Sequence, residues 1–184
     1  MGKINKKGIM IFLTAVMITL TATACNQGSS ESSEAPVNRL EAIIERGYIE
    51  VATEPYFAPY EFIDPSKQGD EQYVGSDMEL AKYIAEELGV ELRIVPLEFS
   101  AVLGSITEGK YDLAISALSY IPSRAEAMNM SKGYYFAENA PGHGLLIRKA
   151  DKDIISGPDD LSDKTVVAQS GSLQELFVNE QVPK

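Results

Sequence analysis

The sequence has few of the residues on which enzymes and metal centres most often depend. It contains one histidine, His143, and one cysteine, Cys25. A single histidine argues against a Ser-His-Asp hydrolase and against a histidine-rich metal site. A single cysteine excludes a disulfide within the chain.

Basic residues are also scarce. Of 16 lysines and arginines, Lys3, Lys6 and Lys7 lie in the first eight residues, which leaves 13 basic against 27 acidic residues. A surface with this excess of negative charge repels a phosphate backbone, so we expect no nucleic-acid partner. The acidic residues show no metal-loop spacing, and we expect neither a metal nor a cofactor.

The chain begins with the layout of an export signal. A basic leader precedes an apolar stretch from Ile9, and small residues follow up to Cys25. The apolar stretch ends by Ala24, which is shorter than the roughly 18–20 residues of a membrane-spanning helix. This layout predicts a signal peptide over residues 1–24 and an exported protein, with a membrane anchor as the alternative.

The residues around Cys25 predict a lipid anchor. The stretch TATAC resembles a lipoprotein signal, in which the cysteine thiol is lipidated (for example with palmitate) and leads the mature chain. Ala22 departs from that pattern, where leucine is more typical, and ordinary cleavage after Ala24 is the alternative. An exposed thiol would be reactive in an oxidising compartment, which favours lipidation. We therefore expect a protein lipid-anchored to the outer face of the cell membrane, or periplasmic if the cell has an outer membrane.

The rest of the chain alternates between helix and strand patterns. The Ser-rich residues 25–36 predict a disordered tether of about 17–20 Å. Helices are predicted over 37–47, 76–89, 100–109, 159–163 and 172–180, and strands over 48–54, 90–97, 111–118, 142–149 and 164–170. Strands separated by helices indicate an α/β fold with a parallel sheet.

The composition changes at residues 138–144, which predicts a crossing between two lobes. We expect lobe 1 over 37–138 and a partial lobe 2 over 139–184. The second lobe would have about 45 residues, close to the size below which a core rarely sustains itself. The sequence is therefore interpreted as incomplete on its C-terminal side.

One helix has clear boundary signals. Ser76 and Glu79 have the spacing of a capping box, and Gly89 is a typical helix stop. Between them, the apolar stripe of Leu80 and Ile84, continued by Leu88, predicts a core-facing side.

Polar and aromatic residues follow two of the predicted strands, where ligands of an open parallel sheet bind. Glu54 and Phe57 follow the first strand in a loop stiffened by prolines, and Ser116, Ser119 and Arg124 follow another. A guanidinium matches a carboxylate as a two-pronged donor, and hydroxyls and turn N–H groups add further donors. The pattern predicts a cradle for a small carboxylate beside an aromatic wall.

The same residues also have purely structural interpretations. Serine and proline after a strand often form only a turn, Arg124 has Glu126 nearby as a surface partner, and the aromatic rings could fill the core. For residues 134–136, Tyr-Tyr-Phe, hinge packing is the favoured interpretation, and a place beside the cleft near the hinge is the alternative. His143 is interpreted as a structural residue.

Five motifs in a fixed order carry a family resemblance. The stretches ATEPYFAPYEF, VGSDMELAKYIAEELG, EGKYDLAISALSYIPSRAEAM, SKGYYFAE and TVVAQSGSLQE occur in this order between Val37 and Lys184. The set resembles the polar amino-acid-binding proteins of ATP-driven importers, which are family 3 of the bacterial extracellular solute-binding proteins. The resemblance implies a two-lobe, type II periplasmic-binding-protein fold, with the first lobe nearly complete and the second partial.

The resemblance also implies a function. Such a protein is a monomeric, non-enzymatic receptor that closes on a polar amino acid and delivers it to the permease and ATPase subunits of an ABC importer. The resemblance implies that Phe57 packs on the ligand side chain and that Ser116 and Ala117 contact the ligand ammonium. It also implies that Ser119 and Arg124 bind the α-carboxylate.

Three further positions match the family. The resemblance implies that Ser172 and Leu173 begin a second-lobe helix whose N–H groups face the same carboxylate. Glu54 matches a position that in some relatives faces a cationic side chain, although a supporting role behind the ligand is equally consistent with the pattern. The sequence does not identify the amino acid.

Two alternatives and one departure remain. The fold is shared by periplasmic cyclohexadienyl dehydratases, for which Glu54 would be the candidate general acid, and a truncated, non-functional fragment is also possible. The family's acidic residue for the ligand ammonium and its return strand would lie further along than Lys184. Losing one charge-assisted bond costs about 1.5–3 kcal/mol, so we expect this polypeptide to bind amino acids weakly or not at all.

Overall fold

A computed structural model describes residues 38–136 and 142–183 of the chain. The predicted signal peptide (1–24), Cys25, the tether (25–36) and the predicted lobe boundary at residue 138 lie outside the described residues. Among the helices in these two ranges, none combines the length and the apolar character needed to cross a membrane.

A three-stranded parallel sheet forms the centre of residues 38–136. The strands are β1 (Tyr48–Thr53), β5 (Glu91–Pro96) and β6 (Leu113–Ala114), in the order β5-β1-β6. β1 pairs with β5 along its whole length and with the much shorter β6 through Val51 and Ala52. The parallel pairing confirms the predicted α/β class.

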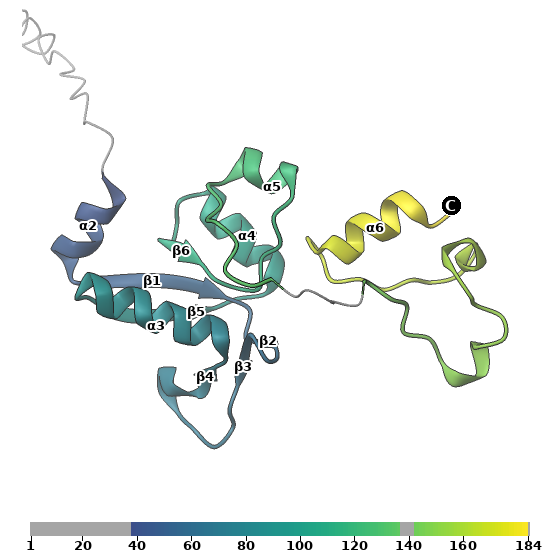
Figure 1. Cartoon of the computed structure of the whole chain (residues 1–184), viewed down its shortest axis with the longest axis horizontal. Helices are drawn as coiled ribbons and strands as arrows, with labels where there is room; N and C mark the ends of the chain where they lie inside the picture. The colour runs from purple at the N-terminus through teal and green to yellow at the C-terminus, as the bar shows by residue number, and fades with distance from the viewer. Residues whose placement is uncertain (1–37, 137–141, 184) are drawn as a thin grey trace, which may run out of the picture. The chain divides into compact units, whose positions relative to one another are not determined.

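Residues 38–136 contain four α-helices, of which the first three were predicted and the last was not. They are α2 (Arg39–Arg46), α3 (Ser76–Leu88), α4 (Phe99–Thr107) and α5 (Pro122–Ala127), and Figure 1 shows α3 running along the sheet beside β1 and β5. Because α3 joins β1 to β5 and α4 joins β5 to β6, each parallel crossover contains a helix.

A second, antiparallel sheet was not predicted. It contains β2 (Tyr56–Phe57), β3 (Glu61–Ile63) and β4 (Tyr73–Val74), with the 3₁₀ turn Gly69–Gln72 before β4. Strands of two or three residues are too short to produce a hydrophobic alternation, so their pairing depends on tertiary contacts.

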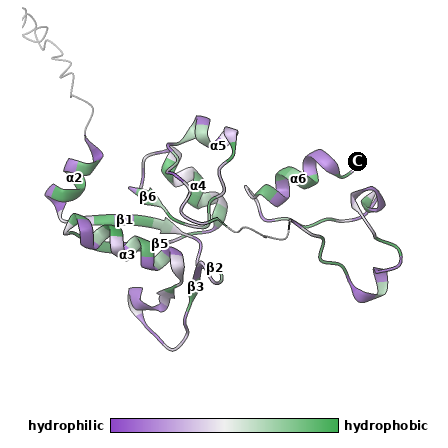
Figure 2. Cartoon of the chain, in the orientation of Figure 1, coloured by the Kyte–Doolittle hydropathy of each residue, from purple (hydrophilic) through white to green (hydrophobic). Residues whose placement is uncertain are grey.

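The core lies between α2, α3 and the parallel sheet. Its buried residues are Ile43, Ile49, Val51, Ala81, Ala85 and Ile115. The predicted stripe of Leu80, Ile84 and Leu88 packs against this core but is only partly buried. Ala81 and Ala85 are the buried core residues that α3 contributes, and Figure 2 shows hydrophobic and hydrophilic residues alternating around this helix.

The start of α3 differs from the prediction, and the difference matters for the site. Gly75, not Ser76, is the N-cap, and no side chain caps the helix, so the predicted capping box is wrong. Instead, the N–H groups of Ser76 and Asp77 donate to the carbonyls of Pro59 and Tyr60. Gly75 has φ +123°, and a Cβ atom there would overlap the Tyr60 carbonyl.

Residues 142–183 contain two 3₁₀ turns, Lys149–Asp151 and Pro158–Leu161, and the helix α6 (Leu173–Gln181). The helix confirms the prediction over 172–180. The strands predicted over 142–149 and 164–170 are wrong for this structure: no strand occurs within residues 142–183. A strand needs a neighbour for its backbone N–H and C=O groups, and here apolar side chains such as Leu146 and Val167 stay exposed.

Candidate functional site

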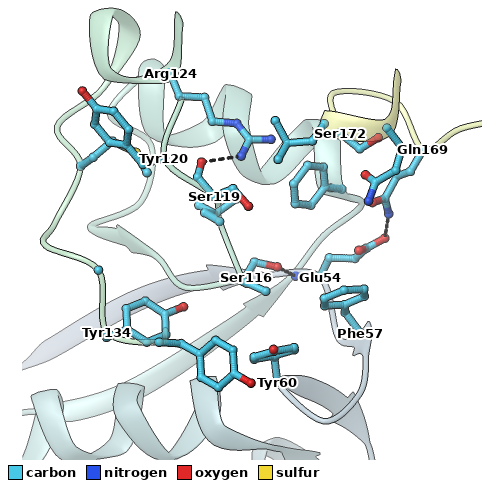
Figure 3. Close-up of a pocket in the computed structure, with 18 of the residues that line it drawn as sticks. Glu54, Phe57, Tyr60, Ser116, Ser119, Tyr120, Arg124, Tyr134, Gln169 and Ser172 are labelled. Carbon is cyan, nitrogen blue, oxygen red and sulfur yellow. Dashed lines mark hydrogen bonds between the residues drawn. The ribbon is translucent and has the colours of Figure 1, made fainter. Parts of the chain in front are cut away.

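A cavity of about 820 Å³ opens where β1 and β6 end. Its lining comes from the loops after these strands, from α5, from residues 130–136 and from residues 167–174, and Figure 3 shows several of these side chains. The eight residues predicted to bind a ligand all line it: Glu54, Phe57, Ser116, Ala117, Ser119, Arg124, Ser172 and Leu173. Their individual roles stay predictions.

Ser116 fixes the end of β1 beneath the cavity. Its hydroxyl accepts the backbone N–H of Glu54 at 3.0 Å and donates to Oε1 of Glu61 at 3.0 Å. Because Ser116 is buried and both of its bonds are to protein groups, its side chain is a structural link as well as a cavity residue.

Ala117 adopts an unusual backbone conformation at the cavity surface. Its φ of +44° lies in the left-handed region, which residues with a Cβ seldom occupy. Its N–H donates to Oδ2 of Asp77 at 2.7 Å, and the Tyr134 hydroxyl donates to the same oxygen at 2.9 Å. Asp77 is fully buried at the start of α3, so a carboxylate behind the wall fixes two cavity residues.

Arg124 is buried, and it is the cavity's guanidinium. It donates to the carbonyl oxygens of Ser119 and Gly171, each at 2.9 Å, and lies 5.5 Å from the centre of the Phe99 ring. Burial lowers the pKa of Arg124 from its ordinary value, but an arginine remains protonated at neutral pH. A guanidinium has five N–H donors, and these two bonds to carbonyl groups use two of them.

Ser119 contacts Arg124 through its carbonyl oxygen, which accepts a guanidinium N–H at 2.9 Å. Its role at a ligand carboxylate stays a prediction. The residue itself is exposed. Its hydroxyl therefore remains available to the cavity.

Aromatic rings form one side of the cavity. Phe57 and Tyr60 are stacked with ring centres 5.6 Å apart, and Tyr60 meets the edge of Tyr135 at 5.3 Å. Phe57 is half exposed, with 52% of its surface accessible, so its ring has a free face for a ligand. An aromatic face attracts both apolar groups and cations.

For residues 134–136, hinge packing was the favoured interpretation and a place beside the cleft the alternative. Tyr134, Tyr135 and Phe136 all line the cavity, as the alternative expected.

Gln169 was missed by the sequence analysis. Its Nε2 donates to Oε1 of Glu54 at 2.6 Å, and an isolated glutamine in the sequence carries no pattern that would predict this contact.

The start of α6 lies at the cavity and is capped by its own side chains. The Ser172 hydroxyl accepts the N–H of Glu175 at 3.1 Å, and the Glu175 carboxylate accepts the N–H of Gly171 at 2.7 Å. The first N–H groups of a helix have no intrahelical acceptor, so those of Leu173 and Gln174 are available to an anion.

Positive and negative groups are both present in the lining, as a zwitterion requires. Glu54 is the carboxylate, and Arg124 and Lys132 are the cations. His143 also lines the cavity, with its Nδ1 3.0 Å from the amide nitrogen of Gln174. Across residues 38–136 and 142–183, no group of three or more histidine, cysteine or acidic residues could hold a metal ion. The arrangement can bind a small amino acid through both ends.

Comparison with known proteins gives three informative relatives. The arginine-binding extracellular protein ArtP of Bacillus subtilis is 30% identical, over 95% of this chain and 60% of its own length. The amino-acid-binding protein AbpA of Streptococcus pneumoniae, solved with L-arginine, is 43% identical with a TM-score of 0.65, over 77% of this chain and 57% of its own.

The third relative is a single domain. A mutant of the arginine-bound domain 1 of TmArgBP, from T. maritima, is 34% identical with a TM-score of 0.51, over 62% of this chain and 88% of that chain. The chain thus spans about 60% of the full-length relatives. The model of the family described as "Bacterial extracellular solute-binding proteins, family 3" matches residues 49–181. The chain therefore belongs to family 3 of the bacterial extracellular solute-binding proteins.

Proposed function

We propose that this protein is a receptor for a cationic α-amino acid, with L-arginine as the expected ligand, and that it presents this ligand to the permease and ATPase subunits of an ABC importer. The observation that carries the proposal is the presence of a buried guanidinium, Arg124, and a carboxylate, Glu54, in one cavity. The guanidinium suits the α-carboxylate, and Glu54 suits a cationic side chain.

The aromatic wall fits the same ligand. Phe57 and Tyr60 offer two stacked rings in the same lining, and a planar guanidinium stacks well on an aromatic face. The remaining donors come from the Ser119 hydroxyl and from the N–H groups of Leu173 and Gln174, which act on an anion as other helix N-termini do.

The relatives support arginine as the ligand. ArtP is named as an arginine-binding protein, and AbpA was solved with L-arginine. The arginine-bound domain 1 of TmArgBP supports measurable binding by residues 38–136 without a complete second lobe. The sequence left two outcomes open for this polypeptide, weak binding or none. The domain 1 relative favours weak binding, and we propose a dissociation constant above the micromolar range.

Transport requires the ligand to favour one state of the receptor. A ligand shifts such an equilibrium only through contacts that differ between the states. Arginine held by Glu54 and Arg124 while meeting the start of α6 would provide those contacts, and the permease would recognise the result. The relatives are named as binding proteins, which favours this function over a dehydratase.

Glu54 is expected to determine the preference for a cationic ligand. Replacing it in the variant Glu54→Gln should weaken L-arginine binding about tenfold or more, because a charge-assisted hydrogen bond of about 1.5–3 kcal/mol becomes a neutral one. Binding of L-citrulline, a neutral analogue of the same shape, should change by less than about threefold. NMR titration of the full chain with both ligands measures the two dissociation constants.

The matched control is Glu87→Gln, which removes an exposed carboxylate from α3. It should leave both dissociation constants unchanged. If the ratio of the arginine and citrulline dissociation constants were the same in Glu54→Gln as in the wild type, Glu54 would not contact the ligand side chain. Failure of the wild-type protein to bind any amino acid at millimolar concentration would refute the receptor proposal for this chain.

We also propose that Cys25 carries the lipid that holds the receptor at the outer face of the membrane. The small residues before Cys25 support this proposal. Expression in a bacterial host with a radiolabelled fatty acid should give a labelled, membrane-associated protein. The variant Cys25→Ser should lose the label and enter the soluble fraction. A labelled Cys25→Ser protein would exclude this anchor.

A further inference from the structure

Two buried carboxyl groups lie behind the wall of the cavity without lining it. Glu61 on β3 is 1% exposed, and Asp77 in the first turn of α3 is fully buried. No lysine or arginine forms an ion pair with either of them within residues 38–136 and 142–183. Two unpaired carboxylates at such depth would be strongly unfavourable.

Each carboxyl group holds residues of the cavity in place. Through the Ser116 hydroxyl, Glu61 is linked to the backbone N–H of Glu54. Asp77 accepts the N–H of Ala117 and the hydroxyl of Tyr134. Four cavity residues therefore depend on this pair, and one of them, Ala117, has a strained backbone that its bond to Asp77 helps to hold.

The remaining oxygens of the pair complement each other. Oε2 of Glu61 and Oδ1 of Asp77 are buried and have no hydrogen-bond partner if both groups are ionised. One proton on Glu61 would satisfy both atoms at once, because a protonated carboxyl donates and a carboxylate accepts.

The electrostatic environment favours that proton. Burial, followed by the negative charge of Asp77, raises the pKa of Glu61 to about 8, and Glu54 adds to the effect. The other titratable groups close to the pair are the phenols of Tyr60 and Tyr134, and burial, with the charge of Asp77, raises the pKa of Tyr134 as well. At neutral pH, Glu61 is therefore mostly protonated.

We propose that Glu61 and Asp77 are positioning residues that share one proton, and that this shared proton holds the floor of the ligand cavity in its binding geometry. Protonated Glu61 donates through Oε2 to Oδ1 of Asp77, which leaves Oδ2 of Asp77 for Ala117 and Tyr134. When the proton leaves, two negative charges face each other behind the cavity, and the links to the four cavity residues weaken. The binding readout rests on the proposed function, whereas the unfolding readout does not.

The first test measures thermal unfolding of the full chain from pH 5 to pH 9 without ligand. The folded pKa of Glu61 lies above its ordinary value of 4.5, so its contribution is complete below about 4.5 and is lost as the pH rises through about 8. The variant Glu61→Gln keeps an amide donor for Asp77 and an oxygen for Ser116. Between pH 5 and pH 9, the midpoint temperature of wild-type unfolding should fall by roughly 5–10 °C more than that of this variant.

Two further variants sharpen this result. Glu45→Gln, an exposed carboxylate on α2, should follow the wild-type profile at every pH. Asp77→Asn removes the charge that raises the pKa of Glu61, so its alkaline step should move to lower pH. If the midpoint temperatures of the wild type and Glu61→Gln changed in parallel with pH, the proposal of a shared proton would be wrong.

The second test measures the L-arginine dissociation constant at pH 7 and pH 9 by NMR titration. The wild type should lose about fivefold to tenfold in affinity at pH 9, and Glu61→Gln should keep its affinity. A pH step in unfolding without one in binding would overturn the positioning role. Absence of binding at both pH values would contradict the proposed function, while the unfolding profiles would still decide whether the pair shares a proton.

Discussion

Replacing Arg124 with lysine should weaken L-arginine binding by about a hundredfold. Two charge-assisted bonds to the ligand carboxylate would be lost or misaligned, each worth about 1.5 kcal/mol or more, and each 1.4 kcal/mol is a factor of ten. A lysine keeps the charge but has no planar fork, and it cannot reach the carbonyls of Ser119 and Gly171 in the same geometry. NMR titration up to millimolar ligand concentration measures the change.

A matched control is available on the surface. Arg148→Lys alters a guanidinium that is 85% exposed and pairs with Asp151, so arginine binding should stay within a factor of two. If Arg124→Lys bound arginine within about threefold of the wild type while remaining folded, the α-carboxylate would have to bind elsewhere, and the orientation of the ligand would be wrong.

Removing the carboxylate of Asp112 should destabilise the protein by about 3 kcal/mol. Its side chain is 1% exposed and pairs with Arg46 and with Arg39, the latter at 3.5 Å. It also accepts the backbone N–H of Glu50 at 2.8 Å. In Asp112→Ala the partly buried guanidinium of Arg46 keeps its bond to the Tyr48 carbonyl but loses its carboxylate partner. The part-buried N–H of Glu50 loses its acceptor, and each loss is costly. Urea unfolding followed by circular dichroism at pH 7 gives the free energy.

The control for Asp112 is a carboxylate in an exposed pair. Glu91 pairs with Arg93 at 3.0 Å, and its side chain is 63% exposed. Because solvent screens such pairs, Glu91→Ala should cost less than about 1 kcal/mol. Equal losses in the two variants would mean that the Asp112 cluster contributes no more than a surface ion pair.

The parallel sheet was predictable because its signals are local and long. β1, β5, α3 and α6 each carry a run of residues with one clear period, and their predicted bounds agree with the structure to within two residues. The two strands expected over 142–149 and 164–170 failed for the opposite reason. Their apolar residues match a strand pattern, but a strand forms only when a partner accepts its backbone bonds.

The candidate site was predictable where a residue type has a particular chemistry. Glu54, Ser116 and Ser119 follow the ends of strands, whereas Arg124 lies in α5. The family resemblance assigned all of them to one pocket. The contacts behind the pocket were not predictable, since Glu61 and Asp77 look like surface acids in the sequence and only the packing of β3 against α3 buries them. Gln169 reaches Glu54 across 115 positions of the sequence, a separation that no local pattern reports.

The residue before α3 has a consequence for how ligand preference can change. Gly75 leaves no room for a side chain beside the backbone of Tyr60, and Tyr60 is one of the two stacked rings at the cavity. A library of variants that changes the rings at positions 57 and 60 can therefore yield new ligand selectivities. In a library that also varies position 75, most variants will fail to fold correctly. The close approach of Gly75 to the Tyr60 carbonyl therefore fixes the backbone that carries these rings.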